Sequence, residues 1–280
     1  MALIPPFFID CVVAIGTQNE KGEKQWIGTG FLVGKHNKDI TGQEKRYHTF
    51  LITNKHVIAD VKSIIVRFNP KGNEPAKDYT IDLTNKASLS IAEHPTPEID
   101  VVAIYINPSV LNRDQARFAF FKLDEHALYL SDMKEQSVSE GDFVYVLGFP
   151  MGIVAPDRQY VIIRSGVIAR LRDVVDQKSR EFLIDANVFP GNSGGPVILK
   201  PEFVKIDKTS SHKNASLIGI ITSYVTYRDV AISQQTNQPR VIFEENSGLA
   251  VVVPADFIRE TVEEAFKDLV KKASQQKSKP

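Results

Sequence analysis

The 280-residue sequence contains a single cysteine, Cys11, so no intramolecular disulfide can form. This excludes the small secreted domains that depend on disulfides, and we expect Cys11 to be a small buried strand residue. Charge of one sign is also lacking: 34 basic and 34 acidic residues exclude a general electrostatic attraction to nucleic acid or to an anionic membrane. Neither an H-E-x-x-H motif nor paired cysteine and histidine ligands are present, so we expect no metal and no cofactor.

Long apolar runs are missing too. No run reaches the length of a transmembrane helix. The apolar N-terminus lacks the positively charged flank of a signal peptide, because the first lysine is Lys21 and Asp10 interrupts the apolar residues. Pro5 and Pro6 are expected to break any early helix. We therefore predict a cytoplasmic protein.

Short apolar, β-branched runs separated by polar turns dominate the sequence. A first group lies at 7–17, 27–33, 47–54, 63–68, 78–84 and 101–106. A second group lies at 143–149, 160–170, 181–186, 195–200, 216–225, 240–245 and 248–254. Many short strands with little helical periodicity are typical of all-β proteins. The two groups predict two six-stranded antiparallel β-barrels.

The predicted organisation has three parts: an N-terminal barrel at 1–120, a C-terminal barrel at 121–254, and a helix with a polar tail at 255–280. The boundary falls in the more polar stretch 107–142. An apolar stripe made of Ile258, Val262, Ala265, Phe266 and Leu269 predicts one amphipathic helix at 255–272, packed on the body of the protein. The polar stretches 34–46, 201–216 and 226–240 are expected to be long surface loops.

The segment GNSGGP at 191–196 places Ser193 among three glycines directly after an apolar run. A serine hydroxyl is a poor nucleophile unless a base removes its proton, a carboxylate orients the base, and donors stabilise the oxyanion. His56 is the best candidate base, because it stands where the apolar run 51–54 ends. Asp100 directly precedes another apolar run, where a charge needs a partner. His94, between Glu93 and Pro95, is expected to be a surface residue.

The segment GNSGG also fits the G-x-S-x-G turn of α/β-hydrolases. That fold needs an acid and then a histidine after the serine, and the later histidine is His212, in a polar loop with Asp207 as the one aspartate between them. The alternating strands and helices of an α/β fold are also missing. The order histidine, aspartate, serine remains.

Three segments then carry a resemblance: TNKHVI with His56, DVVAIYI with Asp100, and DANVFPGNSGGPVI with Ser193. They resemble the signature segments of trypsin-like (chymotrypsin-fold) serine proteases, specifically the HtrA/Deg-like branch. Further segments match in order, among them GTGFLV, GDFVYVLGFPMG, SGVIAR, GIITS and NSGLAVVVP. The resemblance covers residues 7 to about 258.

The resemblance implies a serine endopeptidase that cuts protein or peptide substrates through an acyl-enzyme, with His56, Asp100 and Ser193 as catalytic residues. The backbone amides of Gly191 and Ser193 would form the oxyanion hole. Asn192 stands where digestive members carry an aspartate that pairs with a newly cut N-terminus. Since an amide cannot form that ion pair, activation by propeptide cleavage is not expected.

Substrate binding is assigned by the same resemblance to Asn187 and to the strand Ile221, Thr222 and Ser223, whose edge would pair with the substrate. These positions carry no carboxylate, so we expect a small or medium uncharged side chain rather than Arg or Lys. The PDZ domain that the resemblance implies is not expected after Pro254. The loop 226–245 is long enough to cover or remodel the pocket.

An alternative stays open from another functional class. The chain would then be a latent or inactive module with a protease fold, which binds peptides or a regulatory partner and is controlled by loop rearrangement. The sequence does not define the oligomeric state.

Overall fold

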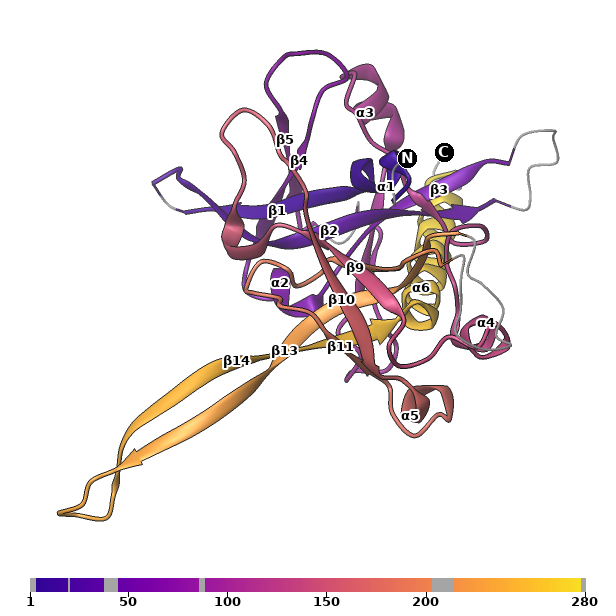
Figure 1. Cartoon of the computed structure of the whole chain (residues 1–280). Coiled ribbons are helices and arrows are strands. Elements are labelled where there is room, and N and C mark those ends of the chain that lie inside the picture. The colour runs from indigo at the N-terminus through magenta and orange to yellow at the C-terminus, as the bar shows by residue number, and fades with distance from the viewer. Residues whose placement is uncertain (1–3, 20, 38–44, 86–88, 203–213, 278–280) are drawn as a thin grey trace.

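The computed structural model describes residues 4–19, 21–37, 45–85, 89–202 and 214–277. These residues form an N-terminal sheet, a C-terminal barrel and a long C-terminal helix (Figure 1). The all-β prediction with one long helix at the end is confirmed. Residues 38–44 and 203–213 of the expected surface loops, with Asp207 and His212, lie outside the described residues.

The N-terminal sheet is antiparallel along the path β5-β4-β1-β2-β3-β7-β6, and the two-residue β8 adds a parallel pairing to β2. It differs from the expected closed six-stranded barrel, because β5 and β6 end the path without pairing with each other. The bounds of its strands are β1 (Val12–Gln18), β2 (Lys24–His36), β3 (Tyr47–Thr53), β4 (Ser63–Phe68), β5 (Lys77–Asp82), β6 (Ile91–Glu93), β7 (Val102–Ile106) and β8 (Phe121–Lys122).

The C-terminal barrel is closed, as expected, with six strands in the order β10-β11-β14-β13-β12-β9. β8 lies just beyond the boundary expected at residue 120 and still pairs with the N-terminal sheet. The domain limits themselves stay a prediction. The bounds of the barrel strands are β9 (Phe143–Gly148), β10 (Ile162–Arg170), β11 (Phe182–Asp185), β12 (Pro196–Leu199), β13 (Ser216–Ile232) and β14 (Pro239–Pro254).

Short helices precede β1 or lie between strands. They are α1 (Pro6–Asp10), α2 (Lys55–Ile58), α3 (Pro108–Arg113), α4 (Leu130–Glu135), α5 (Arg172–Val175) and the 3₁₀ turn η1 (Pro150–Gly152). The expectation that the early prolines exclude a helix is wrong, because Pro6 opens α1, where its missing N–H has no helical partner to lose. Cys11 is fully buried, as expected, but it caps this helix instead of lying in a strand; burial raises the pKa of its thiol well above the ordinary value.

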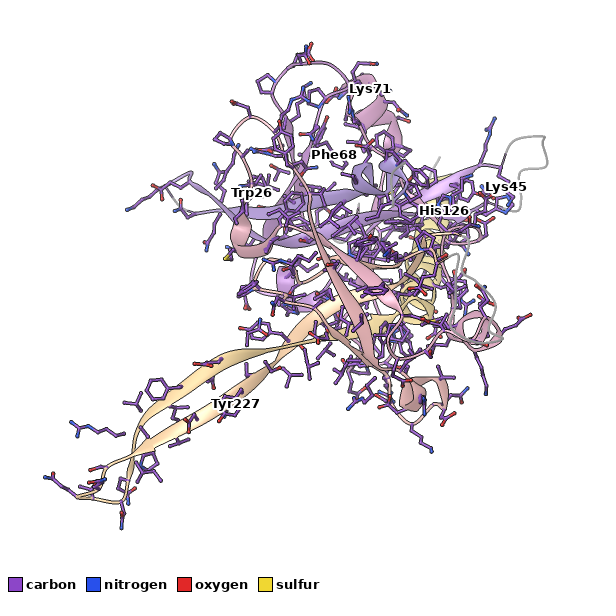
Figure 2. The ribbon with its side chains drawn as sticks, viewed as in Figure 1. Trp26, Lys45, Phe68, Lys71, His126 and Tyr227 are labelled. Carbon is purple, nitrogen blue, oxygen red and sulfur yellow. The ribbon has the colours of Figure 1, made fainter. Side chains whose placement is uncertain are left out.

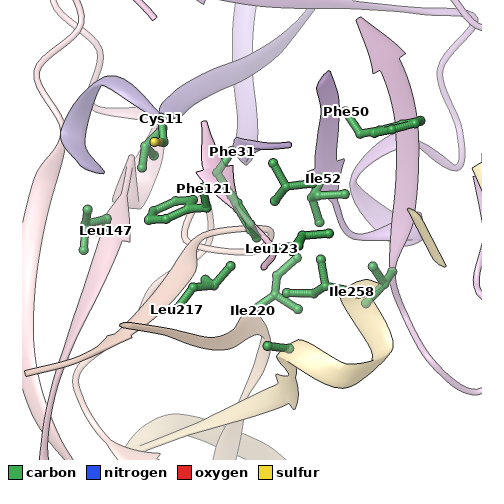
Figure 3. Close-up of a cluster of buried hydrophobic side chains, with 14 of the residues drawn as sticks. Cys11, Phe31, Phe50, Ile52, Phe121, Leu123, Leu147, Leu217, Ile220 and Ile258 are labelled. Atoms are coloured by element: carbon green, nitrogen blue, oxygen red, sulfur yellow. The ribbon is translucent and has the colours of Figure 1, made fainter. Parts of the chain in front are cut away.

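One apolar cluster joins the two halves of the protein. It includes Phe31 of the N-terminal sheet, Phe121 of β8, Leu147 and Leu217 of the barrel, and Ile258 of the C-terminal helix, all buried (Figure 3). Two further clusters fill the N-terminal sheet and the barrel separately. Burial of apolar surface between the halves therefore fixes their relative position.

The C-terminal helix α6 (Ala255–Lys277) confirms the predicted amphipathic helix and extends beyond it. Its stripe residues Ile258, Val262 and Ala265 are fully buried, and the helix packs against β6, β7 and β13. It thus covers both halves. The expectation of a surface His94 is wrong: this residue is buried beneath α6, and its Nε2 lies 3.0 Å from Oε2 of Glu260 on that helix.

The paired strands β13 and β14 continue past the barrel as a two-stranded arm, residues 226–246 (Figure 1). Their side chains stand clear of the body; Tyr227, Ile232 and Phe243 are 59%, 60% and 53% exposed (Figure 2). The stretch expected as a loop is therefore mostly strand, and it projects away from the body.

The turn between β11 and β12 packs tightly against β2. The Thr29 amide donates a hydrogen bond of 2.9 Å to the carbonyl oxygen of Ser193. At Gly194, the next residue, φ is +83°, and a side chain would collide with the carbonyl oxygen of Thr29 and the hydroxyl of Thr53. Only glycine permits this contact between the two halves.

We expect the arm to contribute little to the stability of the body, since a two-stranded ribbon without a core is marginal in water. Replacing residues 227–245 with an Asn-Gly turn should leave the Tm measured by calorimetry within about 3 °C of the wild-type value. A fall of more than about 10 °C would contradict this account of the arm.

Two glycine substitutions separate backbone strain from steric collision. Gly141 has φ +97° with no atom within 4 Å of an added Cβ, whereas at Gly194 the Cβ would strike backbone. We expect Gly141→Ala to lower the free energy of unfolding by about 1 kcal/mol and Gly194→Ala by about 3 kcal/mol or more. Urea denaturation of both variants measures the difference, and equal losses would contradict the packing described for Gly194.

Candidate active site

Pairing between β3 and β7 brings His56 and Asp100 together. Thr53, the last residue of β3, lies opposite Val102, the first residue of β7, so the residues just after β3 and just before β7 are neighbours. His56 lies in the first turn of α2, which begins directly after β3. The Asn54 amide group donates a 2.7 Å hydrogen bond to the Asp100 carbonyl and holds the two chain segments in place.

The carboxylate of Asp100 contacts His56 at two points. Its Oδ2 lies 2.5 Å from Nδ1 of the imidazole, and its Oδ1 accepts a 3.2 Å hydrogen bond from the His56 backbone amide. Burial alone would raise the pKa of Asp100, but the hydrogen bonds and charge of His56 outweigh it, and the pKa is lowered. An ionised carboxylate only accepts hydrogen bonds, so Nδ1 carries a proton, and in the neutral imidazole Nε2 is then the acceptor.

The turn that carries Ser193 is held by its own hydrogen bonds. Asn192 is buried; its Oδ1 accepts from the Phe189 amide at 3.0 Å and its carbonyl accepts from the Gly195 amide at 2.8 Å. The Ser193 hydroxyl donates a 3.3 Å hydrogen bond to the carbonyl oxygen of Thr222 on β13. The serine hydroxyl thus faces β13.

A pocket of about 480 Å³ brings most of the expected site residues together. Those that line it are His56, Asp100, Ser193, Ile221, Thr222 and Ser223. The remaining lining residues are Glu181, Val188, Phe189, Pro190, Tyr224 and Thr226. The base of the arm therefore forms part of the wall, while the arm itself extends away from the body (Figure 1).

Asn187 is not brought into this pocket. Its neighbours Ala186 and Val188 are buried, and extended backbone alternates its side chains, so the Asn187 side chain is exposed and lies beside Gly248. Val188 forms the wall in its place.

Gly191 has φ +97°, and a side chain there would collide with the backbone of Phe149 and η1. Thr29 fixes the backbone at Gly191. Its hydroxyl donates a 2.6 Å hydrogen bond to the Gly191 carbonyl and accepts a 3.0 Å hydrogen bond from the Phe149 amide. Sequence reasoning missed Thr29, although the segment GTGFLV contains it. The feature that marks Thr29 is the full burial of its polar side chain, and this burial is visible only in the folded structure.

Glu181 was missed as well, because it lies outside the three motif segments, as the first residue of the apolar run 181–186. Burial and the charge of Asp100 raise the pKa of its carboxyl group. Over the described part of the chain, no group of three or more His, Cys, Asp or Glu side chains is placed to hold a metal ion. None of the helices that the structure describes is both long and apolar enough to cross a membrane.

Comparison with known proteins finds relatives in sequence. "Probable periplasmic serine endoprotease DegP-like" proteins of Pseudomonas putida and Hahella chejuensis are 24% and 23% identical over 212 residues, which is 75% of this chain. The chain spans only about a third of their length, 34% and 35%. Their names place them in the periplasm, whereas the cytoplasmic location expected for this chain stays a prediction.

The MamO protease domain of Magnetospirillum magneticum, solved in its apo form, is 13% identical and aligns with a TM-score of 0.48 over 90% of this chain and 96% of that one. The family model of the trypsin-like peptidase domain matches residues 28–202, which contain His56, Asp100 and Ser193. The chain therefore belongs to the trypsin-like peptidase domain family.

Proposed function

We propose that this protein is a serine endopeptidase that hydrolyses peptide bonds of protein substrates with His56, Asp100 and Ser193 as its catalytic residues. One observation carries the proposal: His56, whose imidazole and backbone amide both contact the Asp100 carboxylate, lines the same pocket as Ser193. A base oriented by a carboxylate beside a serine hydroxyl is the arrangement that activates serine for attack on a carbonyl.

The backbone around Ser193 supports an oxyanion hole. The Pro190 carbonyl accepts a 2.6 Å hydrogen bond from the Met151 amide, and no peptide bond in the described chain is cis. In a trans peptide the N–H points opposite to the carbonyl, so the Gly191 N–H is directed away from η1. The Ser193 N–H is set in the same way by the bond from Gly195 to the Asn192 carbonyl.

Both N–H groups are available to a ligand. Within the described residues, neither the Gly191 amide nor the Ser193 amide donates a hydrogen bond to the protein. Paired donors that are fixed in advance stabilise the negative charge of a tetrahedral intermediate, because they need no reorganisation during the reaction. Gly191 and Ser193 are accordingly the proposed oxyanion-hole donors.

The proposed reaction moves one proton through His56 in each of its two halves. Nε2 accepts the proton of Ser193 Oγ as Oγ bonds to the substrate carbonyl carbon, and it then gives this proton to the leaving amine as the C–N bond breaks. Water attacks the resulting ester and passes a proton to Nε2, which returns it to Oγ when the acid product leaves. Asp100 stays ionised throughout and stabilises the imidazolium.

The proposed substrate strand lies along β13. Ile221, Thr222 and Ser223 line the pocket, and the Thr222 carbonyl points toward the Ser193 hydroxyl. An extended peptide that donates a hydrogen bond to this carbonyl would lie with its own carbonyl carbon beside Ser193. Pairing of this kind supplies affinity from the backbone, while the side-chain pockets supply specificity.

A second candidate function is a latent or inactive module with the same fold. The observation that favours it is the hydrogen bond from Ser193 to Thr222 in place of one to His56, which leaves the proton relay incomplete. Substrate binding, or a regulatory partner, would then turn the hydroxyl toward Nε2.

Labelling with a fluorophosphonate probe distinguishes the two functions. We expect the purified wild-type protein to be labelled on Ser193, and Ser193→Ala and His56→Ala to remain unlabelled, because the reaction needs both the nucleophile and its base. In-gel fluorescence measures the product. Absence of labelling in the wild-type protein, alone and in cell lysate, would support the inactive module.

Thr29 offers a test of the oxyanion hole. Thr29→Val keeps the shape of the side chain but removes the hydroxyl that holds the Gly191 carbonyl, so we expect the second-order labelling rate to fall about tenfold or more. Thr29→Ser keeps the hydroxyl and should label close to the wild-type rate. Both rates are measured where circular dichroism shows each variant to be folded. A wild-type rate for the folded valine variant would rule out this role for Thr29.

A further inference from the structure

Glu181 is the carboxylate of the pocket that the proposed mechanism does not use. It directly precedes β11 and lines the same pocket as Asp100 and Ser193. Its backbone amide donates a 3.2 Å hydrogen bond to the Ser179 hydroxyl, which in turn donates a 2.8 Å bond to the Glu181 carbonyl. The backbone of Glu181 is therefore fixed, and its half-buried side chain faces the pocket from a defined position.

The nearby cations are paired with other acids. Arg180 lies 3.0 Å from Oε2 of Glu98. Arg170 lowers the pKa of Glu181 through its charge, but its side chain lies 3.1 Å from Oδ2 of Asp173. Among the residues that the structure describes, the Glu181 carboxylate itself takes part in no hydrogen bond or ion pair. An unpartnered acid at a half-buried position is costly unless a ligand supplies the positive charge.

The negative charge of Asp100 increases the free-energy cost of an ionised Glu181 and cannot neutralise it. Its charge acts on Glu181 together with burial, and both effects raise the pKa of the Glu181 carboxyl. Both oxygens of Asp100 are already bound by His56, so a cation that enters the pocket meets the free carboxylate of Glu181. Val188, Ile221 and Tyr224 line the same pocket and offer apolar surface to the methylene stem of a long side chain.

We propose that Glu181 forms an acidic subsite, which binds a lysine or arginine side chain of the substrate close to the scissile bond. The proposal rests on the proposed function, since it assigns the substrate class of the same pocket. It also reverses the expectation that basic side chains are disfavoured. That expectation considered only the residues around Asn187 and 221–223, whereas the carboxylate enters the pocket from a different segment.

Equilibrium binding to the full-length Ser193→Ala protein tests the subsite without requiring turnover. The probes are pairs of fluorescein-labelled hexapeptide pools with random uncharged residues. The two pools of a pair differ only at one fixed position, which is lysine in one pool and norleucine in the other. A separate pair is made for each position along the peptide. Fluorescence anisotropy gives the dissociation constants. At the best position we expect lysine to bind about tenfold more tightly, and the preference to shrink as salt is raised.

Two further substitutions in the Ser193→Ala background identify the group responsible. Glu181→Gln should abolish the preference for lysine while leaving the affinity for norleucine unchanged. Asp185→Asn is the matched control: it removes an acid from the same β11, at an exposed position outside this pocket, and should keep the preference. Equal binding of both pools, no binding of either, or a preference that survives Glu181→Gln would overturn the proposal.

The outcomes separate this subsite from the proposed catalysis. Fluorophosphonate labelling of the wild-type protein together with equal binding of both pools would overturn the acidic subsite alone. A lysine preference that depends on Glu181 in a protein that is never labelled would support the subsite and overturn the catalytic function.

Discussion

The contact of Thr29 with the turn at 190–195 is the constraint on which the site depends. Through its amide and its hydroxyl, this one residue of β2 holds the carbonyl groups of Ser193 and Gly191, and Gly194 lets the two backbones approach. The base and its carboxylate come from the N-terminal sheet, whereas the serine comes from the barrel. Their relative position is therefore set by this polar contact and by the apolar cluster that joins the two halves.

The pair His56 and Asp100 is determined more locally. Both residues lie next to the ends of adjacent antiparallel strands, so the β3–β7 ladder alone brings them within hydrogen-bond reach. The pairing of β3 with β7 helps to build the core, and at its end it also positions a half-exposed imidazole and a carboxylate. The lowered pKa of Asp100 follows from this contact, because the hydrogen bonds and the charge of His56, with a backbone hydrogen bond from Lys55, outweigh the effect of burial.

Features encoded in short sequence segments could be predicted. Alternating or continuous apolar runs located most strands and the helix, and His56 and Asp100 were recognised as strand-end residues. β6 and β8 have three and two residues, too few to show any period. The burial of His94 arises from α6, and the importance of Thr29 and Glu181 arises from contacts with residues more than 80 positions away. Such contacts leave no local pattern in the sequence.

β13 passes through three environments along its length. Residues 217–222 are buried in the barrel, the stretch from Ile221 to Tyr224 lines the pocket together with Thr226, and the end of the strand forms the exposed arm. Register shifts between Ile221 and Ser223 and between Tyr224 and Thr226 mark the middle section. Bulges turn successive side chains to new directions, so one strand can present the neighbouring residues Thr222 and Ser223 to the same pocket. The arm thus begins where the pocket wall ends, and the shape of the wall depends on how β14 pairs with β13 at the base of the arm.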